Sequence, residues 1–229
     1  YDPTVYALAI GYIAGDVARF IISYLADGYR PWPSFDIDVA KKRFSFGKWV
    51  TANSILYFLY SRGDDAFVGW ALMASALGFY QLAYRLSNAP ATEITQTISS
   101  VTFSAYSKVQ NDVKKLRSGY FQTLRMTTLA SFPAAMGIAA VAPAFVEAFF
   151  TPEWRPMIPV MQLLAVYGLL RSMGATMGPV WKAVGRPDYI AKLSALRVAL
   201  IAIFIYPATM MYGIEGTSAL ITGVYIFPM

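Results

Sequence analysis

Long apolar segments alternate with short polar connections along the whole chain. A helix needs about 20 mostly apolar residues to cross the hydrocarbon core of a bilayer. On that scale the pattern predicts seven transmembrane spans, the last truncated: residues 4–26, 46–71, 78–106, 118–148, 157–182, 189–211 and 213 to the end. The predicted fold class is therefore an all-α integral membrane protein, a polytopic helical bundle.

The basic residues of the connections fall almost entirely on one side of this bundle. The three connections on that side carry twelve of them: Arg30, Lys41, Lys42, Arg43 and Lys48 in 27–48, Lys108, Lys114, Lys115 and Arg117 in 107–117, and Lys182, Arg186 and Lys192 in 182–192. The connections on the other side, at 72–77, 149–156 and 212–216, contain one, Arg155. Cytoplasmic loops are enriched in Lys and Arg. The bias therefore predicts that the side with connection 27–48 is cytoplasmic.

Composition agrees with a membrane protein. Hydrophobic residues make up 57% of the 229 residues and charged residues 14%, and the mean hydropathy is +0.46. The chain contains no cysteine and no histidine, which removes disulfides, Cys/His zinc sites, thiolate nucleophiles and histidine acid–base chemistry. We expect no catalytic residue, no metal site and no cofactor. The net charge of +6 is accounted for by the basic loops, so no nucleic acid partner is expected.

Connection 27–48 is the candidate domain boundary. It combines two prolines with mixed charge and runs into a basic amphipathic segment before the next span, a pattern typical of a linker at the membrane surface. The chain opens without Met and closes in apolar sequence. We therefore expect a piece of a longer polytopic protein, in which the linker joins two bundles.

Six arginines fall inside the predicted spans: Arg19, Arg62, Arg85, Arg125, Arg171 and Arg197. They are accompanied by the acidic residues Asp16, Asp64, Asp65 and Glu93. A charge at the bilayer centre costs about 2.5–3.5 kcal/mol on insertion scales. Such residues must face the bundle interior or a watery cavity unless they reach the headgroups. A guanidinium keeps its charge in either environment and clamps phosphate in a bidentate way.

The third span carries one continuous polar face. Its polar residues recur at helical steps of four and three: Gln81, Arg85, Asn88, Thr92, Thr95 and Ser99. Leu82, Leu86, Ile94, Ile98 and Val101 occupy the opposite face, and Pro90 is expected to kink the helix midway. A membrane helix with such a face is predicted to line an aqueous path.

Several charged residues allow two interpretations. Arg62, Asp64 and Asp65 lie in a cavity-lining helix or form a solvated external turn; an integrin-binding role for Arg62-Gly63-Asp64 is disfavoured because so short a string recurs by chance. Asp16 and Arg19 can neutralise each other, being three residues apart on one helix. Arg125 and Arg197 can extend to the headgroups. Arg171 is too deep in its span to do so.

Aromatic residues are abundant, with sixteen tyrosines and five tryptophans. Most are expected in the interfacial belts, where their rings lie at headgroup level. Tyr80 and Tyr84 have the alternative of stacking on sugar rings.

The stretch "SFGKWVTANSILYFLYSRGDDAFVGWALMASALGFYQLAYRLSNAPATEIT" resembles the start of the second half of polysaccharide-export flippases. These are the Wzx/PST-type members of the multidrug/oligosaccharidyl-lipid/polysaccharide (MOP) superfamily. Further similar segments are "FSAYSKVQND", the run from "SFPAAMGIAA" to "WKAVGRPD", and "YGIEGTSA" before the last span. The resemblance covers roughly residues 44–222.

The resemblance implies twelve or more helices in two lobes around a central cavity. Residues 1–26 would then be the last helix of the first lobe, 27–48 the cytoplasmic inter-lobe linker, and 49–229 the second lobe. The resemblance also implies that the protein is located in the cytoplasmic (inner) membrane of a bacterium or archaeon. The preceding helices of the first lobe, which this sequence does not contain, would be partners of the second lobe. Polysaccharide-assembly proteins are further candidate partners, and membrane lipids would surround the protein.

The resemblance further implies transport of a polyprenyl-diphosphate-linked oligosaccharide to the external leaflet. On this hypothesis Arg62, Arg85 and Arg171 bind the diphosphate, and Gln81, Asn88 and Thr92 meet sugar hydroxyls. Asp64, Asp65 and Glu93 bind a coupling ion or act as counter-ions of the arginines, and the residues do not separate these roles. Rocking of the lobes would alternate access.

Three rival functions remain. A multidrug or small-molecule antiporter of the same superfamily would need an acidic, aromatic pocket for cations, whereas the buried charges here are mostly arginine. A membrane enzyme of the same pathway would need an acidic metal-binding cluster or a large catalytic loop, which the chain lacks. A non-transporting scaffold would not need the polar face of the third span.

Overall fold

The computed structural model describes residues 5–26, 37–186 and 188–226, and these are all-α apart from short turns. The elements in chain order are α1 (Val5–Ala26), α2 (Ile37–Lys108), α3 (Val113–Phe149), the 3₁₀ turn η1 (Pro152–Trp154), α4 (Met157–Ala175), α5 (Met177–Ala183) and α6 (Asp188–Ile226). The described residues contain no strand. The predicted all-α fold class is confirmed.

Two of the long helices are interrupted by one residue with non-helical geometry. In α2 this residue is Met73, with φ 69° and ψ −179°, and in α6 it is Gly213, with φ 60° and ψ −143°. Glycine adopts positive φ without steric cost. Both breaks fall inside predicted connections, 72–77 and 212–216, so the chain leaves the helix where the apolar pattern predicts a turn between two spans.

Within the part of the chain that the structure describes, four helical segments are long and apolar enough to cross a membrane: Ser61–Lys108, Val113–Phe149, Met157–Ala183 and Tyr189–Ile226. The first and the last contain the breaks at Met73 and Gly213, so each spans parts of two predicted segments. The protein is a multi-pass membrane protein.

Contacts divide the chain into two units, Tyr1–Ala52 and Asn53–Met229. The predicted linker 27–48 lies partly outside the described residues, and its second part, from Ile37, belongs to α2. In the first unit Asp16 and Arg19 form the expected ion pair, at 3.6 Å. All other features described below belong to the second unit. Its assignment to a second lobe remains a prediction.

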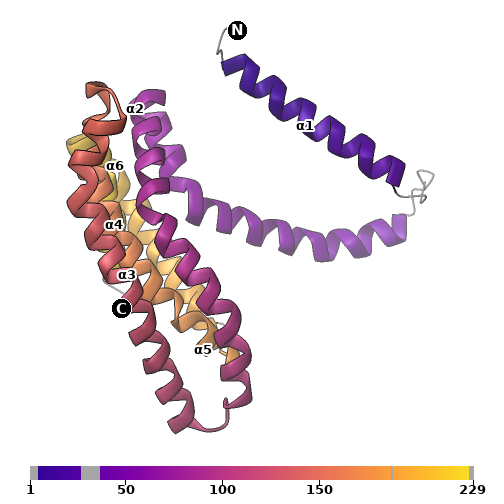
Figure 1. Cartoon of the computed structure of the whole chain (residues 1–229). Helices are drawn as coiled ribbons and strands as arrows, with labels where there is room; N and C mark the ends of the chain where they lie inside the picture. Colours follow the sequence, from indigo (N-terminus) through magenta and orange to yellow (C-terminus); the bar gives the residue numbers. More distant parts are fainter. Residues whose placement is uncertain (1–4, 27–36, 187, 227–229) are drawn as a thin grey trace. The chain divides into compact units, whose positions relative to one another are not determined.

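The second unit is organised around α4, which packs on α3 and α6 and against α2. Its core includes Tyr80, Val146, Val160 and Leu164, all nearly or completely inaccessible to solvent. Figure 1 shows the α2–α3 connection and α5 toward one end of this unit and the α3–α4 connection at the other. Two of the three basic connections are thereby brought to the same end.

Short polar contacts fix the ends of the helices. Asp112 caps α3, with its Oδ1 accepting from the backbone N–H of Lys115 at 3.1 Å. Tyr106 joins α2 to α3 by donating from its hydroxyl to Thr123 Oγ1 at 2.7 Å. These contacts hold the α2–α3 connection in a tight turn, which sets the two helices side by side.

Candidate functional site

Buried polar side chains of α2 meet α4 directly. Ser87 Oγ donates to the carbonyl of Met161 at 2.9 Å, and Asn88 Nδ2 donates to the carbonyl of Leu164 at 3.5 Å. Ser87 and Asn88 are both buried. Each contact joins residues more than seventy positions apart in the sequence, so these polar contacts form only once the two helices have packed.

One helical turn further along α2, Thr92 contacts Arg171 of α4. This residue is half-buried on α4, and its Nη2 donates to Thr92 Oγ1. Among the described residues no carboxylate forms an ion pair with Arg171. Asn88 Oδ1 and Thr95 Oγ1 are buried without a hydrogen-bond partner. We call Asn88, Thr92, Thr95 and Arg171 the α2–α4 polar cluster: it offers an uncompensated positive charge and two unused polar atoms.

The sequence permits this close approach through a glycine. A Cβ on Gly168 would lie 3.1 Å from Asn88 Oδ1 and 3.3 Å from Ala91 Cβ. Small residues let membrane helices pack closely. Pro90, in the same stretch, lacks the N–H that would donate to the carbonyl four residues earlier, while the Thr92 hydroxyl donates back to the carbonyl of Asn88 at 2.9 Å. Helix α2 thus lacks one backbone hydrogen bond where it carries the cluster.

The structure brings together only some of the residues predicted to bind substrate. Asn88, Thr92 and Arg171 share the cluster, whereas Arg85 is exposed and Gln81 is half-buried. The stripe of α2 that packs inward consists of Tyr80, Ala83, Ser87, Asn88 and Ala91. This inward stripe is rotated about the helix axis relative to the predicted polar face. Helix α4 therefore covers one edge of the polar face, and the edge that carries Arg85 stays exposed.

The charged stretch before the break is helical. Residues 61–65 lie inside α2, so they do not form the external turn considered above. Arg62 is exposed and pairs with Asp65 at 3.0 Å. Asp64 Oδ2 accepts from the Tyr80 hydroxyl at 2.6 Å, which links the two parts of α2 across Met73. Glu93, the third acidic candidate, is exposed.

A tyrosine cluster in the core is a feature that the sequence reading missed. The ring of Tyr167 lies 5.9 Å from that of Tyr84 and 5.0 Å from that of Tyr225, centroid to centroid. The guanidinium carbon of Arg197 lies 3.9 Å above the Tyr225 ring. Tyr80, Tyr167 and Tyr225 are buried against other side chains of the unit, and the expected interfacial belt of aromatic residues stays a prediction. The mid-span position of Tyr167 was the available signal, because belt residues lie near span ends.

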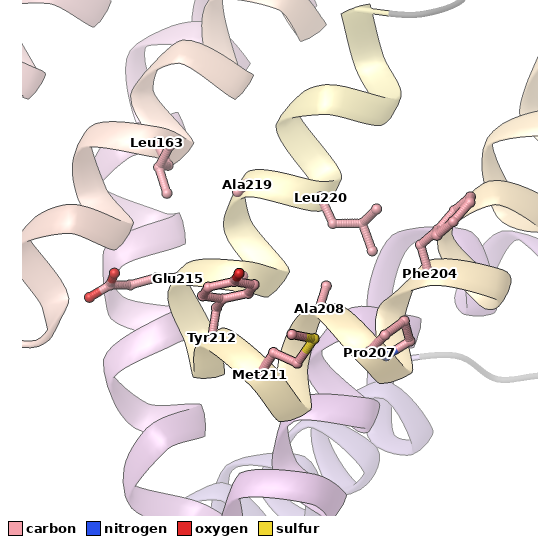
Figure 2. Close-up of a pocket in the computed structure, with 10 residues that line it drawn as sticks. Leu163, Phe204, Pro207, Ala208, Met211, Tyr212, Glu215, Ala219 and Leu220 are labelled. Carbon is pink, nitrogen blue, oxygen red and sulfur yellow. The ribbon is translucent and has the colours of Figure 1, made fainter.

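An apolar hollow of 580 Å³ lies apart from this site, between the two parts of α6 and α4 (Figure 2). Phe204, Met211 and Leu220 border it, and Glu215 supplies the carboxylate at its edge. This lining provides no cation for a phosphate group. The α2–α4 polar cluster is therefore the candidate site for an anionic ligand.

Comparison with known sequences identifies the family. The sequence profile of a family described as "Polysaccharide biosynthesis protein" matches residues 1–159. The chain belongs to this family. "Lipopolysaccharide biosynthesis protein WzxC" of Escherichia coli K12 is 31% identical over 218 residues, which cover 94% of this chain and 44% of WzxC. The predicted membership among Wzx-type proteins is confirmed.

Two further relatives of this chain come from Bacillus subtilis and Haloferax volcanii. "Teichuronic acid biosynthesis protein TuaB" of Bacillus subtilis 168 is 32% identical over 154 residues, covering 67% of this chain and 32% of TuaB. "Probable low-salt glycan biosynthesis flippase Agl15" of Haloferax volcanii is 25% identical over 181 residues, covering 78% of this chain and 38% of Agl15. The chain spans less than half the length of these relatives. No solved structure matches.

Proposed function

We propose that this chain comprises the last helix of the first lobe, the inter-lobe linker and the second lobe of a flippase. The flippase moves a polyprenyl-diphosphate-linked oligosaccharide across the cytoplasmic membrane of a bacterium or archaeon. The observation that carries the proposal is Arg171. This residue is half-buried in a membrane helix, is not ion-paired with any described carboxylate, and donates to Thr92. Thr92 lies within about one helical turn of Asn88 and Thr95, each of which has a buried polar atom without a hydrogen-bond partner. An intramembrane charge of this kind is costly unless it serves a ligand or a water-filled path.

The chemistry of the cluster suits a diphosphate sugar. Arg171 would exchange its bond to Thr92 for charge-assisted, bidentate hydrogen bonds to the diphosphate. Arg85, on the exposed side of α2, would form further hydrogen bonds to the diphosphate in place of its hydration water as the headgroup enters. Asn88 Oδ1, Thr92 and Gln81 would meet sugar hydroxyls, while the polyprenyl tail stays among the surrounding lipids.

The acidic candidates fit a supporting role. The ion pair of Asp65 with Arg62 supports the counter-ion alternative for Asp65. Asp64 accepts a hydrogen bond from the neutral Tyr80 hydroxyl, so Asp64 and exposed Glu93 remain candidates for a coupling ion. Alternating access would come from rocking against the first-lobe helices, and polysaccharide-assembly proteins would supply or receive the glycan.

The names of the relatives support this proposal, because each refers to the biosynthesis of a polysaccharide or glycan. Agl15 carries flippase in its name, and WzxC and TuaB are named for the biosynthesis of lipopolysaccharide and teichuronic acid. These polymers differ chemically. Recognition of a shared diphosphate linkage, rather than of one sugar, would explain an arginine-centred site in such a family.

The test is substitution of Arg171 in the full-length protein. Arg171→Gln should insert normally and lower transport by about tenfold or more, because it removes charge-assisted hydrogen bonds. Arg171→Lys should keep part of the activity, since it retains the charge but not the bidentate geometry. Transport is measured as surface glycan and as flipping of a fluorescent polyprenyl-diphosphate glycan in proteoliposomes.

Arg155→Gln is the matched control. Arg155 is exposed in the α3–α4 connection and pairs with Glu147 at 3.3 Å, so its substitution should leave transport unchanged. Normal flipping by Arg171→Gln at equal protein level would refute the arginine-centred mechanism.

A further inference from the structure

A second place where an arginine borders an apolar hollow lies on α3. A hollow of 470 Å³ is lined by Phe121, Leu124, Arg125, Leu129 and Phe132, together with Thr128 and Pro133. All of these residues come from α3. Phe121, Leu129 and Phe132 are each more than half exposed, so the hollow opens on the surface of the unit and away from the buried core.

Two guanidinium groups mark this surface. Arg125 lines the hollow and is exposed. Arg117 lies two turns closer to the α2–α3 connection, with its guanidinium carbon 5.6 Å from the centroid of the Phe121 ring. Among the described residues no carboxylate pairs with either arginine, and Asp112, which lies near the start of this helix, pairs with Lys115.

These groups follow one line along the helix. Residues 117, 121, 125, 129 and 132 are separated by steps of four and three, which places them on one face. Eight residues of helix separate the two guanidiniums by about 12 Å along the axis. We call Arg117, Phe121, Arg125, Leu129 and Phe132 the α3 stripe. It is cationic toward the basic end of the unit and apolar toward the middle of the helix.

Beside Arg125, the lining of the hollow has no free hydrogen-bond donor. Thr128 donates its hydroxyl to the carbonyl of Leu124 at 2.8 Å. Pro133 has no N–H and cannot continue the helical hydrogen bond to the carbonyl of Leu129. The donors that remain for a ligand are the guanidiniums, at the end of the stripe nearer the basic α2–α3 connection.

We propose that the α3 stripe binds an anionic glycerophospholipid of the leaflet on the basic side of the membrane. Its phosphate lies between Arg117 and Arg125, and one acyl chain occupies the hollow. Charge complementarity selects this occupant: two cations without acidic partners require anionic groups, and the hollow beside them requires hydrocarbon. The site is independent of the proposed transport substrate and of the α2–α4 polar cluster.

The test places a reporter in the hollow. The 229 residues contain no cysteine, so Leu129→Cys in the full-length protein, with any cysteine elsewhere replaced, accepts a single bimane fluorophore. The protein is reconstituted in phosphatidylcholine vesicles containing brominated phosphatidylglycerol, which quenches bimane on contact. The parallel sample contains brominated phosphatidylcholine. Each measurement is repeated with Arg125→Gln, with Arg125→Lys, and with Arg155→Gln as control.

We expect phosphatidylglycerol to quench at a lower lipid fraction than phosphatidylcholine. Arg125→Gln should weaken that preference about fivefold, the value expected for one basic residue near an anionic surface. Arg125→Lys should keep the preference, and Arg155→Gln should not alter it. Because the readout is lipid contact, an inactive but folded transporter gives the same information.

Three results would overturn the proposal. Equal quenching by both lipids would show ordinary, unselective lipid contact. Absence of quenching by either lipid would show that another part of the protein covers the stripe. Displacement of brominated phosphatidylglycerol by undecaprenyl diphosphate more readily than by unlabelled phosphatidylglycerol would assign the site to the transported lipid instead.

Discussion

At the scale of single residues, the α2–α4 polar cluster depends on the absence of a side chain at position 168. Asn88 can approach α4 because Gly168 presents only a hydrogen atom toward its amide oxygen. The same approach brings Thr92 within reach of Arg171. One glycine therefore controls how far the guanidinium lies from the polar atoms of α2.

Replacement of this glycine should separate the two helices. In Gly168→Ala the new methyl group would contact Asn88 and Ala91 at 3.1 and 3.3 Å, and overpacking of this kind costs about 1–3 kcal/mol. We expect a lower melting temperature for the detergent-solubilised full-length protein, together with reduced transport.

Gly137→Ala on α3 provides the comparison, because a Cβ there meets nothing within 4 Å. It should be neutral or stabilising by about 0.5–1 kcal/mol. Equal melting temperatures for the two variants would show that α2 and α4 do not pack as described.

At the scale of elements, the reversal within α6 depends on close packing between its two parts. The two parts of α6 meet through Thr209 and Thr217, whose hydroxyls are completely buried and 2.8 Å apart. Gly216 packs against the backbone carbonyl of Ala208, so closely that a Cβ would collide with it. The turn at Gly213 and the glycine at 216 together allow α6 to fold back on itself.

This packing predicts different effects for two glycines of the same element. Gly216→Ala should strongly destabilise the protein, since the collision involves backbone that cannot move aside. Gly223→Ala, where a Cβ meets nothing within 4 Å, should be tolerated. Size-exclusion profiles of fluorescently tagged full-length variants distinguish the two; a monodisperse Gly216→Ala protein would contradict the close crossing.

The elements also show how far sequence reasoning reaches. Apolar run lengths predicted the long helices, and the breaks at Met73 and Gly213 fall in connections that the runs defined. The polar stripe of the third span predicted Asn88 and Thr92 as site residues, but not that Arg85 stays outside the cluster. A membrane helix can be apolar on faces that meet lipid and on faces that meet protein, so the pattern does not show which face packs.

At the scale of the whole molecule, sidedness is the property that most directly constrains function. The twelve basic residues on one side predict that the α2–α3 connection is cytoplasmic and the α3–α4 connection is external. Because this orientation also defines which leaflet supplies the lipid of the α3 stripe, it requires its own measurement.

Single cysteines report sidedness in this cysteine-free chain. Asn111 and Glu153 are exposed in the two connections. In intact cells a membrane-impermeant maleimide should label Glu153→Cys of the full-length protein and leave Asn111→Cys unlabelled until the membrane is permeabilised. Any other cysteines of the protein are first replaced. The reverse labelling pattern would invert the bundle and the direction of the proposed transport.

The sequence by itself determined the class of molecule: helices of membrane-spanning length, charge concentrated on one side, and membership in a polysaccharide biosynthesis family. These properties are carried by runs of neighbouring residues and need no knowledge of packing. Only the tertiary structure decided that Arg171 meets Thr92, 79 residues away, that Arg85 remains open, and that Tyr80, Tyr167 and Tyr225 are buried. Such contacts follow from the rotation of each helix about its axis, which side-chain packing between helices fixes and hydropathy along the chain does not encode.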